Sequence, residues 1–262
     1  MYSDEHKSYL KKLRKNSFLI RLTQIIIIVL FFILWQLLAD YKIINTFITS
    51  SPKDVAETII SLHNTNNLYN HIGITVLETL ISFLLGTIIG VITATILWWN
   101  DFIAKVLDPY LTILNSLPKV ALGPIIIIWA GASMNSIIIM ALLISVIITI
   151  IDVYQGFKDT NSTKIKLMKS FSATRRQIYF KLLLPSSFTK IISTLKINVS
   201  MSLIGVIMGE FLVSKQGIGY LIMYGSQVFN LDLVVAGIFI LCVIATLMYY
   251  FVLYIEKRLT KN

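Results

Sequence analysis

Residues 120–151 read VALGPIIIIWAGASMNSIIIMALLISVIITII, a run of 32 residues without a charged side chain. A helix that crosses a bilayer needs about 20 apolar residues, so the run is too long for one ordinary span. The small and polar segment GASMNS, at residues 131–136, divides it. The run therefore predicts two membrane-spanning helices, over about residues 110–130 and 136–154.

The composition of the whole chain agrees with a membrane location. Of the 262 residues, 56% are hydrophobic and 14% charged, whereas soluble domains have about 45–50% apolar and about 25% charged residues. The mean hydropathy is +0.79. These values exclude a soluble globule, a disordered chain and a collagen-like repeat. The one cysteine, Cys242, cannot form a disulfide within the chain, so the fold does not depend on an oxidising compartment.

Further apolar runs occupy residues 22–39, 72–99, 188–211 and 233–255. The first run follows a basic start, as in a secretory signal, but it is too long and no small-residue cleavage site follows it. We therefore expect an uncleaved helix there. The predicted fold is all-α: a polytopic membrane protein with six transmembrane helices, in which residues 1–262 form a single transmembrane domain.

Three prolines add detail to this arrangement. Ser51 and Pro52 are placed as the start of an amphipathic helix, which we expect to lie at the membrane interface. Pro118 and Pro124 fall in the third span and predict a kink there.

The formal net charge of +10 comes from basic residues that gather in three places: the first 21 residues, residues 158–190 and residues 257–261. These clusters flank apolar runs, as expected when Lys and Arg remain on the cytoplasmic side of a membrane. A nucleic-acid site would interleave such charges with exposed aromatic residues on a soluble fold. Because six spans place both termini on one side, we expect both termini and the loop over residues 156–187 to be cytoplasmic.

The loop before the fifth span has apolar residues at helical spacing in two short segments. Ile165, Met168 and Phe171 form the first set. Ile178, Leu182 and Pro185 form the second, with Phe180 beside them. One interpretation is a solvated basic loop that only fixes topology. However, a topology signal needs no apolar residues at helical spacing, so the second interpretation is a pair of amphipathic helices that pack against a partner.

This loop resembles the coupling motif, called the EAA loop, of bacterial ATP-binding-cassette importer permeases. That motif reads EAA, three residues, Gly, nine residues, Ile, one residue, Leu-Pro. Aligned on Leu184 and Pro185, the chain has Leu182 at the Ile position and Ser172 at the Gly position, and KLM at residues 166–168 replaces EAA. The spacing and the Leu-Pro pair are present, whereas the Gly and the EAA triplet are not.

The resemblance extends over roughly residues 50–258. Gly205, the triplet GEF at residues 209–211, GIGYLI at residues 217–222 and DLVVAG at residues 232–237 occur in the order and spacing of one subgroup. That subgroup comprises the permeases of sulfonate, taurine, nitrate and thiamine-precursor importers. The resemblance implies a permease subunit in a bacterial cell membrane that imports a small polar or anionic solute of these classes.

The resemblance also implies partners. Two permease subunits, here expected as a homodimer, would form the pathway, two ABC ATPase subunits carrying ATP and Mg would dock on the coupling loops, and an extracytoplasmic binding protein would deliver the solute. The chain itself needs no cofactor or metal under this interpretation. The implied ATPase-coupling residues are Phe171, Ser172, Ala173, Arg175, Arg176, Ile178, Leu182, Leu184 and Pro185.

Charged residues inside spans are costly and often functional. Glu78 and Glu210 are expected near the outer helix ends, and Lys196 is expected to extend toward the cytoplasmic surface. Helix-end anchoring and contact with the pathway both remain open for these residues. The pathway candidates are Lys119, Pro118, Pro124, Lys196 and Glu210.

An enzymatic function is not expected. The chain contains no Gly-Lys pair and thus no phosphate-binding loop of the kind found in ATPases. Paired catalytic carboxylates within one element and a metal-ligand cluster are also missing from the sequence. The alternative function is a secondary transporter that is not coupled to an ATPase, which would need carboxylates near the midplane and often internal repeats. A scaffold or anchor would leave the amphipathic loop helices unexplained.

Overall fold

The computed structural model describes the backbone of residues 4–65 and 67–259 and the side chains of residues 12–65 and 67–258. Lys7, Lys11 and Lys261 of the terminal basic clusters therefore lie outside the described side chains. Throughout the described residues the regular elements are helices. They are α1 (Asp4–Asp40), α2 (Thr46–Thr49), α3 (Pro52–Asn64), α4 (Asn67–Trp99), α5 (Asp101–Ser116), the 3₁₀ helix η1 (Lys119–Leu122), α6 (Gly123–Ala130), α7 (Met134–Lys158), α8 (Ser162–Ser170), α9 (Arg175–Ile178), the π-helix η2 (Tyr179–Leu183), α10 (Leu184–Val213), α11 (Ile218–Gln227) and α12 (Leu231–Leu259).

Five helical stretches in the described part of the chain are long and apolar enough to cross a membrane. They are α1, α4, α7, the continuous stretch from α9 through α10, and α12. These stretches confirm the expected first, second, fourth, fifth and sixth spans. Each helix extends beyond its apolar run by several residues, because polar residues continue a helix outside the hydrocarbon layer as readily as apolar ones.

The expected third span, over residues 110–130, is not one kinked helix. α5 and the segment formed by η1 and α6 meet at an angle of 89°. The described part of the chain therefore has six candidate spans only if this bent pair counts as one broken span. Leu117 is extended, with ψ 138°, because the ring of Pro118 disfavours a helical residue before it. Pro124 lies in the first turn of α6, where its missing N–H costs nothing. The expected kink at Pro124 is therefore wrong.

The stretch between the apolar runs over residues 72–99 and 110–130 is helical from Asp101 onward. Asn100 is the N-cap of α5, and its Oδ1 accepts hydrogen bonds from the backbone N–H groups of Phe102 and Ile103. α5 therefore starts at Asp101 and contains Pro109 within it. The cap and the acidic first turn favour a helix start at this point.

α4, α7 and α10 pack against one another and form the centre of the bundle. Small residues allow this close packing. A Cβ at Gly205 of α10 would lie 2.4 Å from the Cα of Ala141 in α7, and a Cβ at Gly86 of α4 would lie 2.6 Å from Ser145 Oγ. The backbones of these helices are thus nearly in contact.

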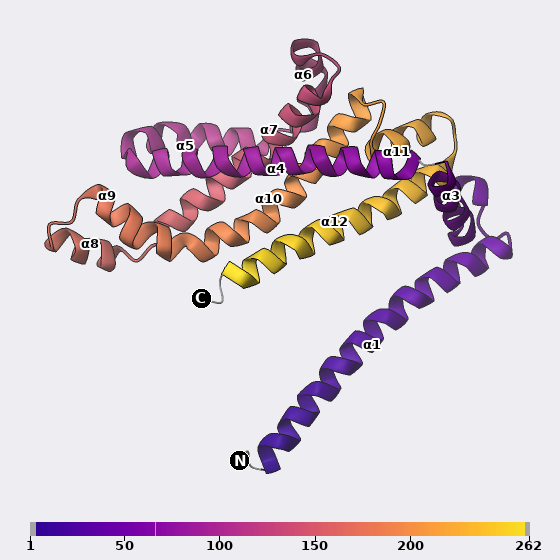
Figure 1. Cartoon of the computed structure of the whole chain (residues 1–262), viewed down its shortest axis with the longest axis horizontal. Helices are drawn as coiled ribbons and strands as arrows, with labels where there is room; N and C mark the ends of the chain where they lie inside the picture. Colours follow the sequence, from indigo (N-terminus) through magenta and orange to yellow (C-terminus); the bar gives the residue numbers. More distant parts are fainter. Residues whose placement is uncertain (1–3, 66, 260–262) are drawn as a thin grey trace.

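The bundle has two recognisable ends (Figure 1). At one end, called here the α9 end, α8 and α9 lie beside the last turns of α4 and α7, and α12 finishes on the same side. At the other, the α11 end, the short helix α11 folds back against α12 and α3 lies beside them. α11 lies between the apolar runs over residues 188–211 and 233–255, and its ten residues are too few for a span.

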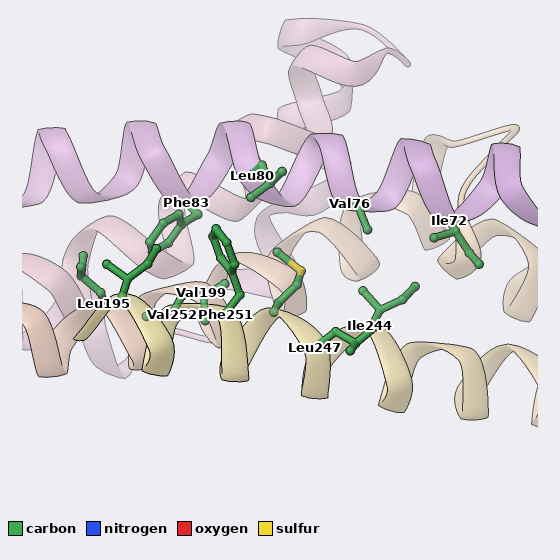
Figure 2. A pocket seen from close by; sticks show the side chains of 12 residues that line it. Ile72, Val76, Leu80, Phe83, Leu195, Val199, Ile244, Leu247, Phe251 and Val252 are labelled. Carbon is green, nitrogen blue, oxygen red and sulfur yellow. The ribbon is translucent and has the colours of Figure 1, made fainter. Parts of the chain in front are cut away.

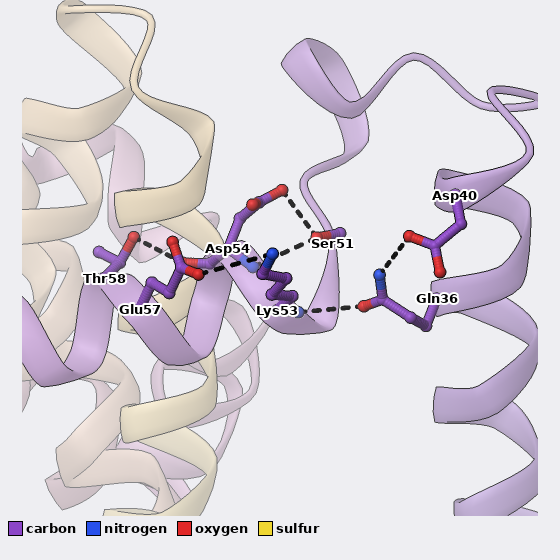
Figure 3. A network of polar contacts seen from close by, with 7 residues as sticks. All are labelled: Gln36, Asp40, Ser51, Lys53, Asp54, Glu57 and Thr58. Carbon is purple, nitrogen blue, oxygen red and sulfur yellow. Dashed lines mark hydrogen bonds and ion pairs between the residues drawn. The ribbon is translucent and has the colours of Figure 1, made fainter.

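α1 diverges from the bundle and approaches it only near the α11 end (Figure 1). The rings of Phe32 and Trp35 contact Phe239 of α12, with centroids 5.7 and 6.1 Å apart. Figure 3 shows the polar junction nearby, where Gln36 Oε1 accepts a hydrogen bond from the backbone N–H of Lys53 (3.1 Å). Ser51 caps α3 by accepting from the N–H of Asp54, which confirms the predicted helix start.

Candidate functional site

The segment with the coupling-motif spacing folds as two short helices joined by a tight turn. α8 ends at Ser170, and Ser172 follows in the left-handed conformation with φ 57°. Thr174 then caps α9: its Oγ1 accepts from the N–H of Gln177, while Gln177 Oε1 accepts from the N–H of Thr174 (2.8 Å). The predicted pair of helices around a turn is confirmed. Ser172 thus holds the conformation that glycine adopts most easily, at the position where the motif has Gly.

Tyr179 anchors this segment to the bundle. Its side chain is buried in a cluster with Ala94 of α4 and Phe157 of α7, and its hydroxyl lies 2.9 Å from Thr95 Oγ1. The rings of Trp98 and Trp99, at the end of α4, have centroids 5.6 and 5.2 Å from that of Tyr179. Sequence reasoning missed Tyr179. Its place next to Ile178 in the amphipathic pattern is the signal that could have indicated that Tyr179 is buried.

Arg175 is held within the chain. Its Nη1 donates to the carbonyl oxygen of Trp99 at the end of α4 (2.5 Å), and its Nη2 lies 3.7 Å from a carboxylate oxygen of Asp101. The Arg175 guanidinium also lies 6.0 Å from the ring centre of Trp98. Arg176 instead extends over the ring of Phe180, at 6.0 Å. The two neighbouring arginines therefore have different surroundings, and Arg175 fixes α9 against the α4–α5 junction.

The structure divides the apolar residues of the segment into an inner and an outer group. Ile178 is only 2% exposed, whereas Phe171 is 78% exposed. Leu182, Leu184 and Ala173 are half-buried, and Ser172 and Pro185 are exposed. The exposed large apolar side chains of the segment are Leu167, Phe171 and Phe180. An apolar face made of Phe171, Ile178 and Leu182 is therefore not continuous, because Ile178 faces the interior.

The candidate pathway residues fall in three separate places. Pro118 and Lys119 lie at the bend after α5, where Lys119 Nζ donates to the carbonyl oxygen of Asn115 (2.9 Å). Pro124 is exposed at the start of α6. Lys196 pairs with Glu256 of α12, with Nζ 3.0 Å from a carboxylate oxygen, and Glu210 lies at the far end of α10. The described structure thus brings none of these three groups together.

Glu210 is enclosed at the α11 end and is 1% exposed. Its Oε1 accepts a hydrogen bond from Thr75 Oγ1 (2.6 Å), and its Oε2 accepts one from the N–H of Gly219 (2.5 Å). Gly217, at φ 103°, is so close that a Cβ there would lie 2.4 Å from the carboxyl carbon of Glu210. Only glycine fits this turn. Glu210 therefore fastens α11 to α10 and α4.

Two further residues of α4 complete this junction. His71 Nδ1 accepts from the N–H of Gly217 (2.9 Å), although the sequence suggests that this histidine lies outside the spans. The carboxyl group of Glu78, which is 2% exposed, adjoins that of Glu210. Both glutamates are in the part of the bundle near the α11 end, but sequence spacing did not predict their contact. In the described part of the chain no group of three or more His, Cys, Asp or Glu residues forms a metal cluster.

A long apolar groove runs along the bundle between α4, α10 and α12 (Figure 2). Its volume is about 520 Å³. Side chains of Val76 and Phe83 from α4 face those of Ile244 and Phe251 from α12 across it. With no polar residue among those that line it, the groove suits hydrocarbon rather than a polar solute.

Comparison with known proteins places the chain among transport components. Residues 86–261 match the family described as "Binding-protein-dependent transport system inner membrane component". A probable ABC transporter permease protein of Haemophilus influenzae is 30% identical over 229 residues, which cover 87% of this chain and 93% of that protein. The formylaminopyrimidine transport permease protein ThiX of Halalkalibacterium halodurans is 27% identical over 215 residues, or 82% and 85% of the two chains. In the MetNI methionine ABC transporter, solved in an inward-facing conformation, one chain matches with a TM-score of 0.65 at 18% identity, over 74% of this chain and 96% of that one.

Proposed function

Because this chain belongs to the family of binding-protein-dependent transport system inner membrane components, the permeases of ABC importers, we propose that it couples the uptake of a small solute to ATP hydrolysis by separate subunits. In this proposal the full chain is one permease domain, and residues 156–187 are its cytoplasmic coupling loop. ATP and Mg bind to the partner ATPase subunits. A second copy of the chain completes the pathway, and an extracytoplasmic binding protein delivers the solute.

The observation that carries this proposal is the construction of the loop at the α9 end. Tyr179, Ile178 and Arg175 fix the loop firmly to the bundle. Phe171 meanwhile projects its ring outward at the tip between α8 and α9, with 78% of its surface exposed. A rigidly held, exposed aromatic side chain is suited to enter a groove of a partner protein, and aromatic anchors supply much of the binding energy at interfaces.

The test is to replace Phe171 with alanine. Burial of such a side chain is worth roughly 1.5–3 kcal/mol, and an interface hot spot loses at least about 2 kcal/mol on truncation. At about 1.4 kcal/mol per tenfold, Phe171→Ala should weaken ATPase association on the order of 30-fold. The measurement is copurification of the ATPase in mild detergent together with solute uptake. Wild-type copurification and uptake in this variant would contradict the coupling role.

Three further variants separate association from stability. Phe47→Ala removes an exposed phenylalanine from α2, outside the loop and near the opposite end of the bundle, and should leave association unchanged. Ile178→Ala removes a buried side chain and should lower the thermal stability of the permease, because a core truncation to alanine costs about 2–5 kcal/mol. Arg175→Ala should likewise loosen the loop, since this arginine donates to the carbonyl oxygen of Trp99 and lies beside Asp101.

For the solute we propose a small polar or anionic molecule of the sulfonate, nitrate or thiamine-pyrimidine-precursor classes. The relative ThiX, named as a formylaminopyrimidine transport permease, supports the last of these. Uptake of labelled sulfonates, nitrate and pyrimidine precursors in a deletion strain, with and without the gene restored, tests the choice. Uptake that persists after the ATPase is inactivated would favour a secondary transporter instead.

A further inference from the structure

A small polar pocket lies at the α9 end of the bundle, where the end of α7 meets the starts of α8 and α10 (Figure 1). Its volume is about 190 Å³. The pocket adjoins the first turn of α8, whereas Phe171 follows the last turn of that helix. It is therefore distinct from the exposed tip of the loop and from the apolar groove. Its polar lining includes Asp159, Thr160, Lys164, Ser186, Ser187 and Lys190.

Two lysine side chains from different helices line this pocket. Lys164 belongs to the first turn of α8, and Lys190 lies near the start of α10. The stem of Lys190 passes over Gly156 of α7, since a Cβ at Gly156 would lie only 2.7 Å from the Cγ of Lys190. Neither ammonium group forms an ion pair within the described part of the chain. Two positive charges that share so small a space repel each other, so an anion between them is favourable.

Thr160 adds a hydroxyl group to the pocket and is 8% exposed. Its Oγ1 lies 3.1 Å from Ser186 Oγ and 3.4 Å from Ser187 Oγ. Ser186 Oγ donates to the carbonyl oxygen of Leu183 (3.0 Å). Ser187 Oγ donates to that of Gly156 (2.9 Å). Because both serine hydroxyls have acceptors of their own, the Thr160 hydroxyl can donate its hydrogen to an oxygen atom of a ligand.

The charge and depth of the pocket indicate the kind of anion. Asp159 is the acidic residue of the lining, and its Oδ1 accepts a hydrogen bond from Gln155 Nε2 (2.8 Å). Two ammonium groups against one carboxylate leave the pocket positive. Gly156 lies five residues beyond Ile151, the end of the apolar run, or about 8 Å along the axis of α7. At this level, just outside the hydrocarbon layer, basic pockets between transmembrane helices bind phosphate-bearing lipid headgroups.

We propose that Lys164, Lys190 and Thr160 form a binding site for one phosphate group, carried either by an anionic membrane lipid or by a soluble phosphate compound. The two ammonium groups would bind phosphate oxygens as point charges, and the Thr160 hydroxyl would donate to another oxygen. A bound phosphate would thereby join the first turn of α8 to α10. This site does not depend on which solute the permease carries or on the coupling role of the loop.

The first experiment measures how fast each lysine is acetylated in the full-length permease, purified in detergent with the subunits that accompany it. N-hydroxysuccinimidyl acetate modifies exposed lysines, and mass spectrometry then reports each lysine separately. The probes are dioleoylphosphatidylglycerol, inorganic phosphate and the phosphate-free lipid dioleoylglycerol. A bound ligand at about ten times its Kd should slow acetylation of Lys164 and Lys190 about tenfold. Lys166 and Lys181, which are exposed and do not line the pocket, should react at an unchanged rate.

The probes distinguish the two sources of phosphate. Protection by phosphatidylglycerol but not by inorganic phosphate would assign the site to a lipid headgroup. Protection by inorganic phosphate would show that a soluble phosphate compound can occupy it. Dioleoylglycerol should protect neither lysine, because it carries the same acyl chains without the phosphate.

The second experiment uses two double variants that have the same net charge. Lys164→Gln/Lys190→Gln removes both ammonium groups of the pocket, and Lys166→Gln/Lys181→Gln is the matched control. Native mass spectrometry measures binding of phosphatidylglycerol and of inorganic phosphate to each. The pocket variant should bind at least about tenfold more weakly, because hydrogen bonds to charged groups are lost. The control should bind as the wild type does. All four side chains are exposed, so neither variant should disturb folding.

Four outcomes would overturn the proposal. The first is that neither phosphatidylglycerol nor inorganic phosphate protects Lys164 and Lys190. The second is equal protection of Lys166 and Lys181, which would show a diffuse attraction to the basic surface. The third is that dioleoylglycerol protects as well as phosphatidylglycerol, and the fourth is equal binding by the two double variants. Solute uptake and ATPase association are not readouts here, so a failure of this proposal is distinct from a failure of the coupling role.

Discussion

Ser172 is the residue at which this chain departs most informatively from the coupling motif. The motif has Gly at this position, and the structure shows why: the backbone there has φ 57°, which is left-handed. For a residue other than glycine this conformation costs roughly 1–2 kcal/mol. The turn nevertheless forms, because the N–H groups of Ser172 and Ala173 donate to the carbonyl oxygens of Lys169 (2.9 Å) and Met168 (3.0 Å).

Ser172→Gly should therefore stabilise the permease by about 1 kcal/mol. The expected result is a higher midpoint of thermal unfolding in detergent. Ser170→Gly serves as the control, because Ser170 is the last residue of α8 and its backbone is helical, where glycine is unfavourable. The explanation fails if both substitutions shift the midpoint equally or if Ser172→Gly lowers it.

Single residues also show where sequence reasoning stops. Glu78 and Glu210 are recognisable in the sequence as costly charges in apolar helices, and their approximate positions in the helices were predicted. Their contact was not, because they belong to α4 and α10 and no local pattern records which faces of two distant helices meet. The same reason applies to His71 and Gly217, which are joined by a hydrogen bond across 146 positions of sequence.

At the scale of helices, local rules predicted most of the elements. Apolar runs located five of the stretches that can cross a membrane, and the Ser51–Pro52 pair located the start of α3. The bend between α5 and α6 was predicted only as a kink, since a proline indicates where a helix is interrupted but not the angle at which the chain continues. The short α11 was missed because it is stabilised by packing against α12, α10 and α4 rather than by its own length.

The contact between α7 and α10 gives a prediction at this scale. In Gly205→Ala the new methyl group would fall 2.4 Å from the Cα of Ala141, so the two helices must separate. Overpacking of this kind costs about 1–3 kcal/mol. We expect a lower midpoint of thermal unfolding and reduced levels of protein in the membrane.

Gly73→Ala is the matched control for this substitution. Gly73 lies in α4 with nothing within 4 Å of an added Cβ, and alanine favours a helix by about 1 kcal/mol over glycine. Gly73→Ala should thus leave stability unchanged or raise it. If Gly205→Ala behaves in the same way, the close approach of α7 and α10 does not govern stability.

For the whole molecule, the two ends of the bundle should lie on opposite sides of the membrane. The α9 end carries the basic cluster of residues 158–190, and basic loops remain cytoplasmic. In a Cys242→Ala background, a cysteine at Gln216 should react with an impermeant maleimide in intact cells. A cysteine at Thr174 should react only after the cells are opened. Labelling of Thr174→Cys from outside would overturn this orientation.

The π-helix between α9 and α10 has a consequence for how such a chain tolerates changes in length. The N–H of Leu184 donates to the carbonyl oxygen of Tyr179, five residues earlier, so this turn contains one residue more than an α-helical turn. Removal of that surplus residue would restore an unbroken α-helix and turn everything before it by about 100° around the axis of α10, with a shift of about 1.5 Å. The direction in which the Phe171 ring points is thus set by a count of residues inside η2, independently of the side chains at the tip itself.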